Sequence, residues 1–341
     1  MIRATLAIAL LSLVPTAAQA APGDEIYTHP GLVAPASDGA RLNFTCLGQG
    51  SPTAVFDAGW SDWAPAWAVV QPRIGAFTRA CAYDRAGSGF SDAGPLPRTT
   101  ERIATELHEA LHAGKISGPY VLVGSAYGGD HARAFADLFP SEVAGLVLVD
   151  ADASDVDNPE NRKDDDDGDL GYVPKLRLCR NAIAAGNAAF ALPPPPGRPP
   201  RMCAQGFFRG LPESEWSPEL NAKLLDIAQH KVAMWDSIIS EMEQMPADEV
   251  WLKEHRRNLG NTPVRILTSG NHGIGHLDRP PEPTIEQLKY EYDRAVAQSH
   301  WLTLSTNAKQ IFVKGSSEYI QFDQPDAVVK AVKDVVELGR R

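Results

Sequence analysis

The stretch from Tyr120 to Gly129, which reads YVLVGSAYGG, decides the fold of this chain. A short apolar run ends in small residues and passes directly into a segment, residues 130–136, that has the composition of a helix. A strand, a tight turn and a helix in this order are typical of a nucleophile elbow, in which glycines at the two outer positions let the backbone turn sharply. Gly124 and Gly128 occupy those positions, so the side chain at the tip of the turn is that of residue 126.

The residue at the tip is alanine, and a methyl group cannot act as a nucleophile. Ser125 is not an equivalent replacement. Moving the frame by one residue would put Val123 and Tyr127 where the turn needs small residues, and it would point Ser125 away from the site. The alternative interpretation is a buried strand, turn and helix that carries no chemistry.

The composition limits the classes of partner. The chain has 341 residues, 43% of them hydrophobic, which is enough for one large domain or two small ones. Its formal net charge of −11 argues against binding to nucleic acid or to anionic membrane surfaces. No G-x-G-x-x-G dinucleotide fingerprint occurs, and we expect no cofactor. The expected partner is a small molecule, and the oligomeric state is not predicted.

The N-terminus has the pattern of a signal peptide over residues 1–20. A positive start, an apolar run at residues 4–14 and an A-x-A-like cleavage site at 18–20 follow one another. The apolar run is too short to span a bilayer, and no cysteine stands at the cleavage point for a lipid anchor. We therefore expect an exported protein without a membrane anchor, either periplasmic or secreted.

Four cysteines in an exported chain predict two disulfides. Cys46 and Cys81 lie on strand-like runs, whereas Cys179 and Cys203 flank a proline-rich loop. The favoured pairing is Cys46 with Cys81 and Cys179 with Cys203. Four free buried thiols, which would suit a cytosolic protein, are the alternative.

Strand-like and helix-like segments alternate on both sides of an insertion, which favours an α/β fold with a mainly parallel sheet covered on both faces. The core is expected to comprise residues 21–151 and 262–341, and a helical lid residues 152–261, with helices near 175–187 and 217–243. Besides the run into the elbow, the expected strands are 41–47, 53–56, 78–83, 143–149, 264–268 and 310–313, and the expected helices are 63–74, 99–113, 284–299 and 325–337.

Four short motifs together resemble the α/β-hydrolase superfamily, and especially its exported bacterial members. They are Ala58–Trp60 (AGW), Ala82–Gly89 (AYDRAGSG), the elbow, and Gly145–Asp150 (GLVLVD). The resemblance is dense over residues 41–150 and looser from Val264 onward. It implies about eight strands with a helical lid inserted after the sixth. Members of the family mostly cleave esters, amides, lactones or epoxides.

The resemblance also implies a catalytic triad, and two of its three positions are substituted here. The family has a serine at the elbow, where this chain has Ala126, and a histidine after the last strand, where this chain has Glu318. No histidine follows His300. Asp150, at the end of the sixth strand, matches one of the two places where the family keeps its acid. That carboxylate is interpreted either as a working acid or as a scaffold residue without a partner.

The oxyanion hole is expected to be intact, because the backbone N–H groups of Trp60 and Tyr127 match the family's donors. His272 and His276 follow the seventh strand, in a loop that faces the same site in this family. Their spacing suits a metal only on a helix, and nearby glycines argue against one, so no metal is expected. We interpret them as loop histidines; the alternative is a swapped dyad in which one of them pairs with Glu318.

These residues favour an enzyme that acts on a small carbonyl compound without a serine nucleophile. An oxyanion hole and one carboxylate suffice for proton abstraction beside a carbonyl, as in elimination, isomerisation or decarboxylation. In an apolar site the pKa of Glu318 would rise toward neutrality, as a general base requires. An inactivated hydrolase and a non-catalytic binding protein are the two alternatives. The sequence does not identify the substrate.

Overall fold

The structure, a computed structural model, describes residues 23–154, 171, 173–193, 200, 202–207, 216–271 and 284–340. The predicted signal peptide lies outside these ranges, and so do His272 and His276. Among the described residues, no helix is both long enough and apolar enough to cross a membrane.

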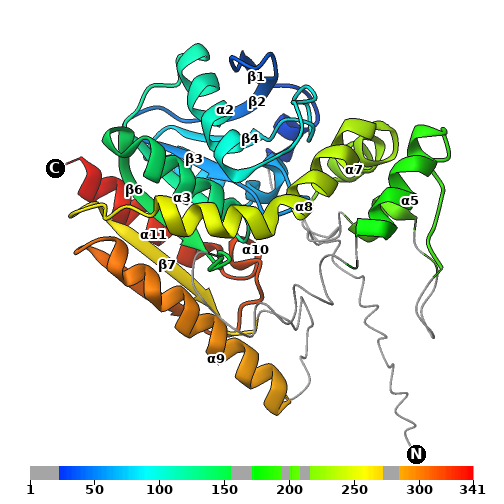
Figure 1. The fold of residues 1–341 in the computed structure, drawn as a ribbon. Helices are drawn as coiled ribbons and strands as arrows, with labels where there is room; N and C mark the ends of the chain where they lie inside the picture. Colours follow the sequence, from blue (N-terminus) through cyan, green and yellow to red (C-terminus); the bar gives the residue numbers. More distant parts are fainter. Residues whose placement is uncertain are drawn as a thin grey trace, which may run out of the picture.

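One eight-stranded sheet organises the core (Figure 1). The strands follow the spatial order β1-β2-β4-β3-β5-β6-β7-β8; β1 and β2 are antiparallel to their neighbours and the remaining pairs are parallel. This confirms the predicted mainly parallel sheet. The strands are β1 (Leu32–Pro35), β2 (Arg41–Leu47), β3 (Thr53–Asp57), β4 (Ala80–Asp84), β5 (Tyr120–Ser125), β6 (Val143–Val149), β7 (Val264–Ser269) and β8 (Ala308–Val313).

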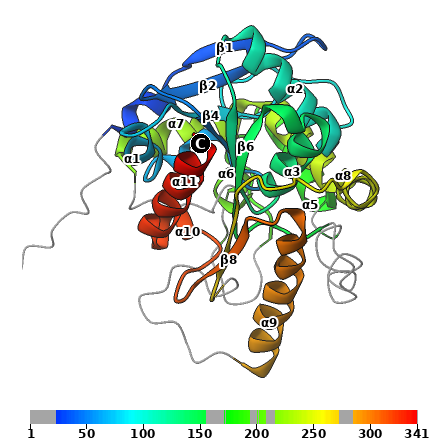
Figure 2. The same cartoon turned by 90° about the vertical axis from the view of Figure 1, so that its left-hand side faces the viewer.

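Helices cover both faces of the sheet (Figure 2). Along β5, Val121 and Val123 belong to one apolar cluster and Tyr120 and Leu122 to the other, because successive strand side chains point to opposite faces. The first cluster includes α1 (Gln71–Gly75) and α11 (Pro325–Gly339), next to the short α10 (Ile320–Asp323). The second includes α2 (Thr100–Ala113), α3 (Gly128–Leu138) and α9 (Ile285–Ser299).

The predicted helix over residues 63–74 is wrong. The chain forms two short pieces instead, η2 (Ala64–Trp67) and α1, each with a proline in its first turn. Proline lacks an N–H and clashes with the preceding turn, so Pro65 and Pro72 can begin helical turns but cannot lie inside one long helix.

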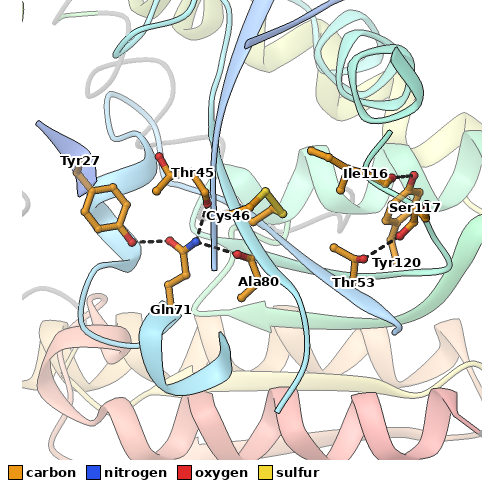
Figure 3. The surroundings of a disulfide bond; sticks show 10 residues. Tyr27, Thr45, Cys46, Thr53, Gln71, Ala80, Ile116, Ser117 and Tyr120 are labelled. Carbon is orange, nitrogen blue, oxygen red and sulfur yellow. Dashed lines mark hydrogen bonds between the residues drawn. A yellow bond between two sulfur atoms is a disulfide. The ribbon is translucent and has the colours of Figure 1, made fainter. Parts of the chain in front are cut away.

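Both predicted disulfides are present. Cys46 and Cys81 face each other on the antiparallel strands β2 and β4 (Figure 3), and Cys179 is bonded to Cys203. The Gln71 amide donates to backbone carbonyls of the same two strands, Thr45 at 2.6 Å and Ala80 at 2.9 Å. These contacts fix the start of α1 against the sheet.

The segment between β6 and β7 contains four helices, as the lid prediction required: α5 (Val173–Ala184), α6 (Cys203–Phe207), α7 (Pro218–His230) and α8 (Val232–His255). Figure 1 shows α5 and α7 to the side of the sheet, and α8 runs from them back along the core, where it contacts α2 and α3. The Lys231 ammonium separates α7 from α8 and donates to the carbonyls of Gly89 and Ser91, at 2.8 and 2.5 Å. The lid segment is thereby attached to the turn that follows β4.

Candidate active site

The tip of the elbow has a left-handed backbone. Ala126, with φ 45°, lies between the end of β5 at Ser125 and the start of α3 at Gly128. Such a conformation costs a residue with a Cβ about 1–2 kcal/mol. The Ala126 N–H donates to Val149 at 3.2 Å and its carbonyl accepts from Gly129 at 2.9 Å, which holds the turn. Ser125, by contrast, is a buried strand residue. Residue 126 is therefore the tip, as the glycine spacing predicts.

The glycines around the tip are required because the backbone segments approach one another closely. A Cβ on Gly124 would lie 2.3 Å from the Gly128 carbonyl oxygen. A Cβ on Gly128 would lie 2.4 and 2.5 Å from the carbonyl oxygens of Ala58 and Asp57. The elbow thus packs directly against the loop that follows β3.

This loop and the elbow together present two backbone donors. Among the described residues, no acceptor takes the backbone N–H of Trp60 or that of Tyr127. A Cβ on Gly59 would lie 3.4 Å from the methyl of Ala126, so the loop touches the tip of the turn. Two unused N–H groups beside the tip have the arrangement that stabilises a developing oxyanion.

Arg85, which is almost fully buried, holds this loop in place. Its guanidinium donates to the carbonyls of Ala58 and Gly59, at 2.7 and 2.8 Å. It also pairs with Asp57 at 2.7 Å and with Glu241 at 3.2 Å. A fixed, planar set of donors can bind several acceptors at once, which a lysine could not do. The conspicuous DRAG sequence after β4 therefore supports the oxyanion loop, a role that the sequence analysis did not assign.

Helix α8 of the lid segment anchors both donor residues. The Trp60 indole donates to the Ile238 carbonyl at 3.0 Å, and the Tyr127 hydroxyl donates to Asp248 at 2.8 Å. Thr100 joins this group by donating to Asp248 at 3.1 Å. The lid segment therefore fixes the side chains beside the two backbone donors.

Glu318 lies, partly exposed, in the loop between β8 and α10. The Asp323 carboxylate shapes this loop by accepting from the backbone N–H and the hydroxyl of Ser317, both at 2.7 Å. The Ser317 hydroxyl in turn accepts from the N–H of Tyr319 at 3.2 Å. Glu318 is thus held in a defined turn, at the place where the family has its histidine.

Asp62 is a second carboxylate at this site, and the sequence analysis missed it. A Cβ on Gly59 would lie 3.5 Å from Asp62 Oδ2, so this carboxylate and the Ala126 methyl flank the same point. Burial raises the pKa of Asp62 to about 7, the charge of Glu318 adds to the rise, and Arg85 opposes it. Within the described ranges, the Asp62 carboxylate accepts no hydrogen bond. No sequence motif marks it, because its partner comes from the far end of the chain.

Asp150 is fully buried and bound to the scaffold. Its carboxylate accepts from the Ser269 backbone N–H at 2.9 Å and hydroxyl at 2.7 Å, and it also pairs with Arg294. The Gln298 amide donates to it at 3.4 Å. These bonds tie β6 to β7 and α9. The role of Asp150 as a catalytic acid stays a prediction.

His131 lies behind the elbow, on α3, and is fully buried. Its Nδ1 is 3.2 Å from Asp57 Oδ2, and its ring lies edge-on to Tyr127 at 4.6 Å. Among the described residues, one group of side chains has the spacing of metal ligands, namely His108, His112 and Glu142. None of these three belongs to the elbow or to the loop after β3.

Comparisons with known proteins agree with this geometry. A family model of the alpha/beta hydrolase fold matches residues 59–178, which include the oxyanion loop and the elbow. An AB hydrolase superfamily protein of Gibberella zeae is 30% identical over 310 residues, which cover 85% of this chain and 87% of that protein. An uncharacterised protein of Schizosaccharomyces pombe is 43% identical over 82 residues, and that match spans 24% of this chain and 15% of the yeast protein.

Among solved structures, an enol-lactonase from Burkholderia xenovorans has a similar fold. Its TM-score is 0.58 at 18% identity, and the match covers 89% of this chain and 99% of the enol-lactonase. The match to the Gibberella protein over most of both chains, together with the elbow and the strand order, identifies the family. This chain belongs to the α/β-hydrolase superfamily.

Proposed function

We propose that this protein is an enzyme that moves a proton next to a carbonyl group of a small molecule, with Asp62 and Glu318 as its acid–base pair. The resulting reaction is an isomerisation or an elimination. The observation that carries the proposal is the coupling of the two carboxylates beside Ala126, where a serine hydrolase of this family would have a hydroxyl and an imidazole.

The pKa of Asp62 supports a role in acid–base chemistry. A group that exchanges protons during turnover works best when its pKa lies near the working pH. Burial, together with the charge of Glu318, raises the pKa of Asp62 to about 7. At neutral pH one carboxyl of such a pair can therefore be protonated while the other is charged.

In the proposed reaction, the Glu318 carboxylate takes a proton from the carbon beside the substrate carbonyl. The electron pair of the broken C–H bond moves into a C–C double bond, and the carbonyl oxygen becomes an enolate oxygen. The backbone N–H groups of Trp60 and Tyr127 stabilise this negative charge. Protonated Asp62 then donates its proton, to the γ-carbon in an isomerisation or to the leaving group in an elimination. No nucleophile at residue 126 is needed.

Exchange of substrate protons for deuterium tests the proposal. The protein is incubated in D₂O with a panel of small ketones, β-keto acids and unsaturated lactones, and loss of the α-proton signal is followed by NMR. We expect exchange with at least one compound, and Glu318→Gln should slow it about 10²–10⁴-fold. Glu337→Gln, an exposed carboxylate change on α11, is the matched control and should leave the rate unchanged. Exchange that survives Glu318→Gln would refute the assigned role.

A second candidate function is that of a serine hydrolase that has lost its activity. The observation that favours it is the retained left-handed backbone at Ala126, a strained conformation that matters only if the tip residue is or was functional. The double variant Ala126→Ser/Glu318→His, assayed on short acyl esters, tests this candidate. Ester hydrolysis by the double variant, with no proton exchange by the native protein, would favour it. The native protein should not react with fluorophosphonate probes in either case, because Ala126 offers no oxygen.

A further inference from the structure

Two histidines and a glutamate meet on the surface between α2 and η3 (Pro140–Glu142). His108 and His112 lie one turn apart on α2, and each Nε2 is 2.8 Å from a different carboxylate oxygen of Glu142. All three ligand atoms lie within 4.8 Å of one another. This cluster takes no part in the reaction proposed above.

We propose that His108, His112 and Glu142 form a binding site for a zinc-class divalent cation. Two imidazoles and one carboxylate are a donor set that zinc uses in proteins, with water or another ligand at the fourth position. Histidines four residues apart on a helix project from the same face, which is the spacing that a shared metal needs. Magnesium and calcium would be bound less well, because they prefer oxygen ligands.

Part of the site is already held in place. The His108 ring stacks on Phe139, with ring centroids 3.7 Å apart and planes inclined by 6°, and it also contacts Phe135. The His112 side chain is 56% exposed, so an ion can reach the cluster from solvent. Only small movements of the side chains are needed to open the two 2.8 Å contacts to the separations found between zinc ligands.

The carboxylate is charged at neutral pH, as a metal ligand must be. Burial acts to raise the pKa of Glu142, but the hydrogen bonds with His108 and His112 outweigh it and keep this pKa below its usual range. The cluster therefore presents an anionic oxygen between two imidazoles without any change of protonation at Glu142.

The position of the cluster indicates a structural role. Glu142 immediately precedes β6, whereas Ala126 follows the opposite end of the parallel neighbour β5. The cluster and the elbow thus lie at opposite ends of the sheet. A bound ion would join the last turn of α2 to the connection between α3 and β6, and it would stabilise the folded core by binding to it.

Thermal unfolding with and without zinc tests the site. The full chain is treated with a chelator, dialysed, and melted with ZnCl₂, with MgCl₂ and without added metal. We expect zinc in large excess to raise Tm by roughly 3–5 °C, and magnesium to leave it unchanged. His112→Ala and Glu142→Gln should each remove the zinc shift. His230→Ala, which removes an exposed histidine on α7, should keep it.

Zinc content and cobalt spectra complete the test. We expect one zinc per chain that depends on His112, and a visible absorption band of four-coordinate Co²⁺ that His112→Ala and Glu142→Gln both abolish. Because His112 is largely exposed, its variant should fold, which its Tm without metal will check. If zinc neither binds nor shifts Tm, or if both effects persist in His112→Ala and Glu142→Gln, the proposal is wrong.

Discussion

The two halves of the candidate site differ in what they retain from the superfamily. On the β3–β5 side, the backbone turn at Ala126 and the loop after β3 have the family arrangement, held by Arg85. On the β6–β8 side, Asp150 is bound by scaffold residues and Glu318 stands in the place of a histidine. Backbone groups thus keep the oxyanion arrangement while the reactive side chains have changed.

This difference has a physical cause. The β3–β5 side is built from close backbone contacts and a buried ion network, so a change there disturbs the folding of the core. The reactive side chains lie at the ends of turns, where a substitution alters the chemistry and leaves the sheet intact. The four predictions below test this contrast in order of decreasing effect.

The largest effect is expected for Arg85→Met. This change leaves Asp57 and Glu241 as buried charges without their cation, which costs about 3–5 kcal/mol in the free energy of unfolding. Urea denaturation measures it. Arg73→Met is the matched control, because Arg73 pairs with Asp326 on the surface and should cost about 0–1 kcal/mol. Equal losses for the two variants would show that the oxyanion loop does not depend on the buried network.

A pH-dependent effect is expected for Asp62→Asn. The folded pKa of Asp62, about 7, lies above its ordinary value, so the folded state binds the proton more tightly than the unfolded state does. The native protein therefore loses stability relative to Asp62→Asn as pH rises from about 4 to about 7. The difference can reach roughly 4 kcal/mol, since each pKa unit corresponds to about 1.4 kcal/mol. Denaturant unfolding of both proteins across this range measures it, and a constant difference would contradict the raised pKa.

The smallest effect is expected for Ala126→Gly. Glycine accepts the left-handed backbone without strain, so this change should raise stability by up to about 1 kcal/mol. The control is Ala134→Gly in the interior of α3, which should lower stability by about 1 kcal/mol or more. A loss of stability at both positions would mean that the elbow is not strained.

Much of the fold follows from the sequence. The alternation of apolar runs with helical segments gives seven of the eight strands, because each buried strand has a continuous or alternating apolar pattern. The short edge strand β1 was missed, since three of its four residues are exposed and carry no such pattern. The two short helices before β4 were merged into one because the effect of Pro65 and Pro72 was underestimated.

The site was predictable only where a motif spans neighbouring residues. The elbow and the substitutions at residues 126 and 318 follow from local spacing. Asp62 does not, because its raised pKa arises from burial and from a residue that the fold brings close. The spacing of His108 and His112 on the predicted helix over residues 99–113 was a usable signal, but only the fold places Glu142 beside them.

The coupling between Asp62 and Glu318 is the central claim, and an NMR titration of the Asp62 carboxyl carbon tests it most directly. In the native protein this carboxyl should titrate with a pKa of about 7. In Glu318→Gln its pKa should fall, because the negative charge that helps to raise it is gone, while burial keeps it above the ordinary value. Glu337→Gln should leave the titration unchanged. An Asp62 carboxyl that titrates near its ordinary value in the native protein, or that does not respond to Glu318→Gln, would contradict the account.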